Sequence, residues 1–271
     1  MIKQIASSRR KPGLTRREYL DYHFKVHGAI ADGTDDRDAK PEKYLQTHAF
    51  DSVYGERLAS IPNANHAWMA RDDVTELYFR DWDHVLACMG SPYVCEKVGP
   101  DASRFADFET AMVLLAHEHE VPLRVLDRQF RAKENEEGAR DVGLFFVAAP
   151  NGSPQGVALD AELTPLLVNA LEETAQDDVR GLLVNVGFTS EKFDVATYFG
   201  GNNMPRYALV YKIVMQNAAS VAAVRRAQAA FANRAVGLFD ESVSYSLFGR
   251  EGLVLDVSKG VRVSETLLIQ W

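Results

Sequence analysis

The chain has 271 residues, 46% of them hydrophobic, and its 38 acidic and 30 basic side chains give a formal net charge of -8. This length is enough for two small domains, each with its own core. The acidic balance, with no Lys/Arg cluster dominating a face, argues against a nucleic-acid partner. No run of about 18 apolar residues is present, so we expect neither a membrane span nor an export signal.

The clearest helix signal follows a strand expected over residues 1–8. Thr15 is a good N-cap, and Glu18 three residues later completes a capping box. We therefore expect a helix to begin at about Arg16 and to end at Gly28.

The remaining elements of the first half are expected in the order strand, strand, helix, strand. Their approximate ranges are 43–51, 66–79 (interrupted), 82–90 and 110–120. The second half repeats the order of a strand, a helix, two strands, a helix and a strand. The ranges there are 142–149, 162–176, 179–189, 207–215, 220–235 and 242–247. Each half therefore predicts a βαββαβ unit.

The charged segment at 131–140 cannot bury a core and marks a domain boundary. We predict an α+β protein with two tandem ferredoxin-like domains, at 1–125 and 140–271, the second of them diverged. Their sheets can close face to face into an intramolecular α+β barrel that leaves an interior pocket. Such a barrel needs no partner for closure, and homodimerisation is left open.

A longer pattern at the first helix carries a family resemblance. Residues 10–28 read Arg-Lys-Pro-Gly-Leu-Thr-Arg-Arg-Glu-Tyr-Leu-Asp-Tyr-His-Phe-Lys-Val-His-Gly, and this segment resembles the opening of an EthD domain of the dimeric α+β barrel superfamily. Residues 72–79, 81–92 and 100–107 resemble other parts of such a domain, so the resemblance extends over residues 1 to about 120. His23 departs from the family pattern, in which this position is often tryptophan, and indicates a site adjusted for other chemistry.

All seven histidines lie within the first 119 residues. We therefore expect the first half to supply acid-base groups and the second to supply scaffold and an apolar wall. On the strand at 43–51, the period of two puts Tyr44 and His48 on one face, opposite Leu45 and Ala49. We expect the smaller residues to pack on the helices, which would leave Tyr44 and His48 in the barrel pocket.

His27, His48 and Tyr78 are the candidate catalytic residues. A histidine can move a proton near neutral pH without a cofactor, and a tyrosine hydroxyl can stabilise a developing phenolate or enolate. The structural alternatives are that His48 only hydrogen-bonds in a polar core and that His27 caps the last carbonyls of its helix. The candidate substrate-binding residues, whose aromatic members are equally typical of core packing, are His23, Tyr44, Tyr54, His66 and Trp68.

Metal and cofactor signals are weak. His117 and His119 share one face of a strand, but His-x-His near a strand end is typical of a solvated edge, and whether the pair binds metal is left open. An acidic loop, which contains Asp32, Asp35, Asp36 and Asp38, lacks the glycine and terminal glutamate of a calcium-binding loop. No Rossmann, Walker or Gly-x-Ser-x-Gly motif is present. We predict no metal and no cofactor.

Two cysteines, Cys88 and Cys95, form neither a disulfide framework nor a zinc pattern, which predicts reduced thiols in a cytoplasmic protein.

The resemblance implies a range of decarboxylases, dehydratases, cyclases and isomerases that act on phenolic and polyketide compounds. We therefore expect a cofactor-independent lyase that uses His/Tyr acid-base catalysis on a hydrophobic aromatic or polyketide-like small molecule. Decarboxylation and dehydration are the favoured reactions, and isomerisation is a further option. One alternative is a cofactor-free monooxygenase of the same barrel type, which O2 dependence would reveal. The other is a non-catalytic binder of such a molecule, because one fold hosts many functions.

Overall fold

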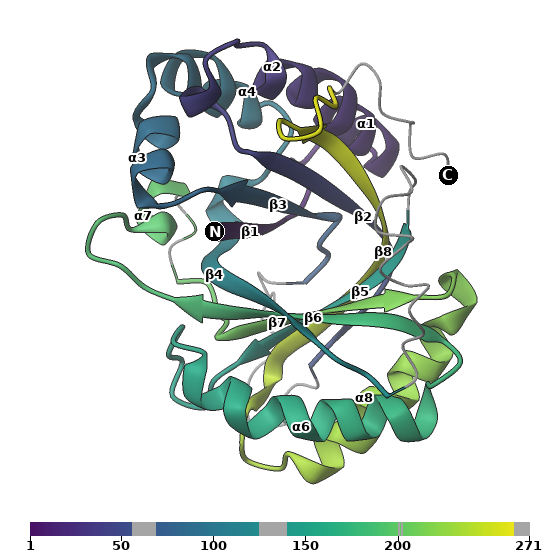
Figure 1. Ribbon diagram of the computed structural model, residues 1–271. Helices are drawn as coiled ribbons and strands as arrows, with labels where there is room; N and C mark the ends of the chain where they lie inside the picture. The colour runs from purple at the N-terminus through teal and green to yellow at the C-terminus, as the bar shows by residue number, and fades with distance from the viewer. Residues whose placement is uncertain (56–68, 125–139, 200, 202, 263–271) are drawn as a thin grey trace.

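The computed structural model describes residues 1–55, 69–124, 140–199, 201 and 203–262. Eight antiparallel strands form one closed barrel in the order β1-β3-β2-β8-β5-β7-β6-β4. The first half supplies β1 (Ile2–Ser8), β2 (Lys43–Tyr54), β3 (Asp73–Phe79) and β4 (Met112–Val121), and the second half supplies β5 (Arg140–Ala148), β6 (Val179–Phe188), β7 (Leu209–Met215) and β8 (Asp240–Asp256). The barrel lies between two helical layers, one from each half (Figure 1).

The helical layers differ in how continuous their helices are. In the first half, one helix consists of α1 (Arg16–Asp21), the π-helix η1 (Tyr22–His27) and α2 (Gly28–Asp32), and a second group consists of α3 (Trp82–Gly90), the π-helix η3 (Val94–Val98) and α4 (Gly99–Ala102). The second half has α6 (Val157–Thr174), the short α7 (Val195–Phe199) and α8 (Val221–Arg234). Short 3₁₀ turns are η2 (Arg37–Ala39), η4 (Phe108–Thr110) and η5 (Ala218–Ser220).

The four strands of each half have the same order across the sheet, namely fourth, first, third, second. Pairing of β2 with β8 and of β4 with β6 joins the two sheets at both edges. The expected closure within one chain is therefore confirmed. Three strands differ clearly from their expected bounds: β2 continues to Tyr54, β3 begins only at Asp73, and β8 continues to Asp256. Of the expected linker, residues 131–139 lie outside the described residues, and Arg140 begins β5.

The first helix begins where the sequence predicts. Thr15 accepts a hydrogen bond from the Glu18 backbone N–H, and the Glu18 carboxylate accepts one from the Thr15 backbone N–H at 2.7 Å. The expected end at Gly28 is wrong. Gly28 has right-handed helical backbone angles and donates its N–H to the carbonyl of His23, which closes a π turn, and the helix continues to Asp32.

The expected orientation of β2 is also wrong. Ala49 points into the barrel, where it packs with Ile5 and Val74, whereas Tyr44 packs with Phe24 and Ala31 of the helical layer. The physical reason is that the helical layer presents hydrogen-bonding partners to the polar face of β2, so the smaller apolar face is the one that fills the barrel.

Described side chains occupy two regions of the barrel interior. An apolar cluster that includes Phe146, Tyr245 and Leu247 fills one region. A buried ionic cluster occupies another, with Lys3 and Lys212 both paired to Glu76, at 2.5 and 2.8 Å. Because both ammonium groups reach the same carboxylate, the ionic cluster connects strands of the two halves.

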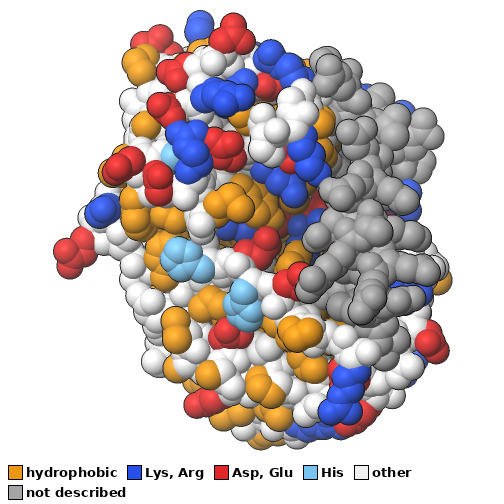
Figure 2. Space-filling model, viewed as in Figure 1, with side chains coloured by type: hydrophobic (Ala, Val, Ile, Leu, Met, Phe, Trp, Pro, Cys, Tyr) orange, Lys and Arg blue, Asp and Glu red, His pale blue; other side chains and the backbone are white. Residues whose placement is uncertain are grey.

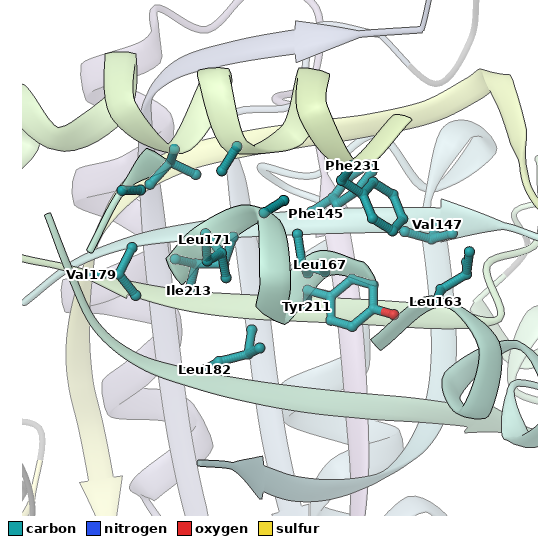
Figure 3. Packing of buried hydrophobic residues seen from close by; sticks show 14 of the residues in the cluster. Phe145, Val147, Leu163, Leu167, Leu171, Val179, Leu182, Tyr211, Ile213 and Phe231 are labelled. Carbon is teal, nitrogen blue, oxygen red and sulfur yellow. The ribbon is translucent and has the colours of Figure 1, made fainter. Parts of the chain in front are cut away.

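The largest apolar core lies between the second-half sheet and the helices α6 and α8 (Figure 3). Phe145 and Val147 point outward from β5 and meet Leu163 and Leu167 of α6 and Phe231 of α8. Close packing of these side chains covers the outer face of this sheet.

The surface shown in Figure 2 mixes acidic and basic side chains over the first-half helices, with hydrophobic groups between them. Across the described ranges, no helix combines the length and the apolar character needed to cross a membrane.

Candidate functional site

A cavity of about 640 Å³ lies between the first-half helices and the outer face of the first-half sheet. The sheet contributes Ala6, Tyr44 and Leu77, and the first helix contributes His23 and His27. Further walls come from Phe105 after α4 and from Tyr198 and Phe199 of α7, the contribution of the second half. The volume is in the range of small-molecule sites, and the lining is mainly apolar.

Asp73, His23 and Tyr44 form a buried hydrogen-bonded series at one wall of the cavity. The Asp73 carboxylate lies 2.5 Å from Nδ1 of His23, and the Tyr44 hydroxyl lies 2.8 Å from Nε2. Because a carboxylate only accepts, it places the proton on Nδ1, and Nε2 of the neutral ring then accepts from Tyr44. Tyr19 donates to the second oxygen of Asp73 at 2.7 Å, so both carboxylate oxygens are bound.

Gln46 extends this series along β2 to His48. Its Nε2 donates to the Tyr44 hydroxyl oxygen at 2.6 Å, and its Oε1 lies 3.0 Å from Nε2 of His48. Burial lowers the pKa of His48 to about 3, which keeps its ring neutral near pH 7. His48 is therefore connected to the cavity wall through Gln46 and Tyr44.

His27 is held by a second carboxylate. Its Nδ1 lies 2.9 Å from Asp101, whose other oxygen accepts from the Tyr22 hydroxyl at 2.7 Å. Within the described part of the chain, Nε2 of His27 has no hydrogen-bond partner, and the ring lines the cavity. Burial, with a smaller contribution from the neighbouring His23, lowers the pKa of His27 to about 4. At neutral pH the Nε2 atom is thus an unprotonated acceptor available to a ligand.

The π-helix η1 contains both histidines. Each π turn holds more residues than an α turn, and such segments are frequent at functional sites. Here the two imidazole centroids are 5.5 Å apart, and both rings pack on Phe105, at 4.6 Å for His23 and 4.9 Å for His27. The aromatic contacts fix the orientation of the two rings beside each other.

The structure divides the residues selected from sequence into separate groups. His23, His27 and Tyr44 meet at the cavity, and His48 is connected to them through Gln46. Tyr78 lies on the face of β3 that points into the barrel, away from the cavity, and its hydroxyl is 3.3 Å from Glu118.

Tyr54 is also inside the barrel, where it stacks on Tyr245 at 5.5 Å between ring centroids, because a β-bulge near Ala49 shifts the register of β2. His66 and Trp68 lie outside the described residues.

Asp73 and Asp101 are the site residues that sequence reasoning missed. Both lie in segments that carry the family resemblance, at the start of β3 and in α4, but neither segment adjoins the histidines in the chain. A histidine whose ring is oriented by a carboxylate is a recurring arrangement in enzymes, so acidic residues in those matching segments were the available signal.

His117 and His119 do not join a metal-ligand set. His119 pairs with Asp160 at 2.9 Å, and His117 stacks on Phe188 with centroids 4.4 Å apart. Over the ranges that the structure covers, no group of three or more His, Cys, Asp or Glu side chains is placed to hold a metal ion.

Two thiols line the cavity, and burial raises the pKa of Cys88 to about 12, so this thiol is protonated at neutral pH.

Fold and site together define an α+β barrel protein with a ligand-sized cavity outside the barrel. The family model of the EthD domain matches residues 11–109, which contain His23, His27, Tyr44, Asp73 and Asp101. Residues 11–109 therefore match the EthD domain that the sequence pattern predicts.

One solved structure supports the fold. An anthrone oxidase-like protein is similar at 10% identity, with 96% of this chain and 94% of that chain covered and a TM-score of 0.51. A candidate chlorite dismutase (11% identity, 95% and 96% covered, TM-score 0.49) and the chlorite dismutase of Candidatus Nitrospira defluvii (9% identity, 93% and 90% covered, TM-score 0.43) are also similar. No curated protein sequence matches the chain significantly.

Proposed function

We propose that the cavity is the active site of a cofactor-independent lyase that acts on a hydrophobic aromatic or polyketide-like molecule. The observation that carries the proposal is the geometry of His27. Asp101 orients its ring through Nδ1, and Nε2 lies at a mainly apolar cavity without a partner among the described residues. An oriented neutral imidazole at such a cavity can act as a general base.

Dehydration uses these groups directly. Nε2 of His27 takes a carbon-bound proton, the electron pair of that bond forms a C=C bond, and the C–O bond breaks. The proton then passes from Nε2 to the departing hydroxyl, so that water leaves and the imidazole returns to its neutral form. Loss of CO2 would instead need a proton delivered to the ring carbon as the C–C bond breaks.

Tyr44 has a role in this scheme that is separate from that of His27. Its oxygen can accept the proton of a substrate phenol while its own proton moves to His23, which Asp73 stabilises. The substrate then carries the negative charge that drives the elimination, and no cofactor is required as an electron sink. His48 and Tyr78, selected from sequence as catalytic, have no direct part in this mechanism because neither contacts the cavity.

The test is incubation of metal-stripped protein with a panel of phenolic and polyketide compounds, with and without O2, followed by mass spectrometry. Loss of about 18 or about 44 mass units without O2 supports a lyase and separates dehydration from decarboxylation. The His27→Ala variant should lose this activity, and His119→Ala, an exposed site outside the cavity, should keep it. Full turnover by His27→Ala would contradict the proposal.

A cofactor-free monooxygenase is the second candidate. A protein of similar fold is described as anthrone oxidase-like, a name that refers to oxidation of an anthrone. The same deprotonated phenol could react with O2, in which case the product gains oxygen and turnover stops without O2. Recovery of unchanged ligand after binding would instead favour a non-catalytic binder.

For the whole chain, we propose that the two halves are tandem ferredoxin-like domains, at 1–125 and 140–271. The equal strand order of the two halves supports this division. The free Cys88 and Cys95 are consistent with a reducing cytoplasm. Because the barrel closes within one chain, a homodimer would have to form through the outer surface, and analytical ultracentrifugation tests it.

A further inference from the structure

The charge of the cavity wall distinguishes anionic from uncharged ligands, a distinction that the proposed function does not make. Of the described residues that line the cavity, none is a Lys, Arg, Asp or Glu. The nearest acidic groups lie directly behind the wall, because Asp73 binds His23 and Asp101 binds His27. An anion in the cavity would therefore have no lysine or arginine on the described wall to pair with and would face two carboxylates behind the histidines. Burying an unpaired charge is costly.

Cations near the rim do not reverse this balance. The Lys11 ammonium is exposed and donates to the carbonyl of Ser103 at 3.1 Å, and Arg104, also exposed, lies 3.7 Å from Asp101. Both groups point into solvent, where water and salt screen their fields.

At the histidine wall of the cavity, His27 and Tyr44 present hydrogen-bond acceptors to a ligand. Nε2 of neutral His27 accepts, and the Tyr44 oxygen can accept because its own proton is directed to His23. These two acceptors, in a mainly apolar cavity that also includes the polar side chains of Gln4, Ser8 and Thr75, suit hydroxyl donors, whereas a carboxylate brings only acceptors.

We infer that the cavity selects an uncharged, hydroxyl-bearing aromatic compound and excludes carboxylates of the same shape. This inference rests on the proposal that the cavity is the active site. It narrows the reaction from decarboxylation of an acid to dehydration or isomerisation of a neutral phenol or enol.

The experiment measures binding, so it does not depend on turnover. Calorimetric titration at pH 7.5 uses three probes of one ring system, 2-naphthol, 2-naphthamide and 2-naphthoate. We expect 2-naphthol to bind most tightly and 2-naphthoate to bind at least about tenfold more weakly than 2-naphthamide, its uncharged analogue. Binding of naphthoate as tightly as the amide, or no binding of 2-naphthol, would overturn the inference. Absence of turnover with the expected binding order would instead count against the lyase alone.

A matched pair of variants tests whether the carboxylates behind the wall cause the preference for the uncharged ligand. Asp101→Asn keeps the shape of the side chain and removes one carboxylate behind the wall, so the amide/naphthoate ratio should fall severalfold. Asp160→Asn removes an equal charge beside His119, outside the cavity, and should leave the ratio unchanged. An equal fall in both variants would mean that overall charge, rather than the cavity wall, sets the preference. Circular dichroism and the amide affinity confirm that each variant is folded.

Discussion

The two halves of the barrel share one strand order but cover their sheets differently. On β5, Phe145 and Val147 point outward and are packed by the uninterrupted helices α6 and α8. On β1, the first strand of the other half, the outward positions include Gln4 and Ala6, and these line the cavity. Ala6, Ser8 and Thr75 are small, and under a helix that is interrupted by a π turn they leave space where the second half has a core.

The two halves also differ in what they contribute to stability and to chemistry. The second half supplies the larger apolar cluster, whereas the first half supplies the buried histidines and their carboxylates. A cavity lined by such groups costs stability, since its wall lacks the packing contacts of a filled core. The same topology thus serves as scaffold in one half and as site in the other.

The largest expected effect is in the first half. His27→Ala should reduce kcat by about 10²- to 10⁴-fold, the usual contribution of a general base, with little change in the affinity for an inert analogue. Asp101→Asn should give a smaller loss, because the imidazole remains but its orientation is weakened. Steady-state kinetics at saturating substrate provide the measurement. A loss in affinity alone would assign His27 to binding.

A matched pair of leucines tests the difference in packing. Leu167→Ala, in the filled core, should lower the free energy of unfolding by about 2–5 kcal/mol. Leu77→Ala, at the wall of the cavity, should cost less, because the side chain removed already borders empty space. Urea denaturation of both variants gives the values. Equal costs would show that the cavity wall is as tightly packed as the core.

Acid should loosen the first half before the second. The pKa of His27 is lowered from 6.5 to about 4, and that of His48 from 6.5 to about 3. Between pH 6.5 and these lowered values, the unfolded chain binds protons that the folded chain does not. Stability is therefore present above pH 6.5 and decreases as the pH falls, by on the order of 3 to 5 kcal/mol for each histidine.

Hydrogen exchange at pH 7.5 and 5 should show faster opening in β2 and η1 at the lower pH, with β5 and β7 changing less. His48→Gln should reduce the pH dependence of the urea midpoint. An unchanged dependence would mean that other groups, such as the buried carboxylates of the barrel, control the acid response.

The smallest effect is expected where the second half touches the site. Tyr198 of α7 is 43% exposed and lines the cavity. Tyr198→Ala should weaken the binding of 2-naphthol about two- to fivefold, below about 1 kcal/mol, with kcat nearly unchanged. A large fall in kcat would show that the second half contributes to the chemistry as well as to the wall.

Local sequence signals predicted much of the fold. The capping box at Thr15 set the start of the first helix, and the repeated order of elements gave two similar halves, because caps and periodicity depend on neighbouring residues. The prediction failed at Gly28, since a glycine C-cap signal did not anticipate the π turn that continues the helix. The choice of His23, His27 and Tyr44 as site residues remains a prediction, although the structure does place all three at one cavity.

Tertiary structure decided which face of β2 meets the helices and where the cavity lies. Alternation along a strand identifies its two faces. It does not say which face points into the barrel when the barrel interior buries one face and the helices bury the other. Asp73 and Asp101, 50 and 74 residues from their histidines, became partners only through the packing of the first helix on β3 and α4. The sequence by itself therefore determined the elements and the residues capable of acid-base chemistry, and long-range packing determined which of them act together.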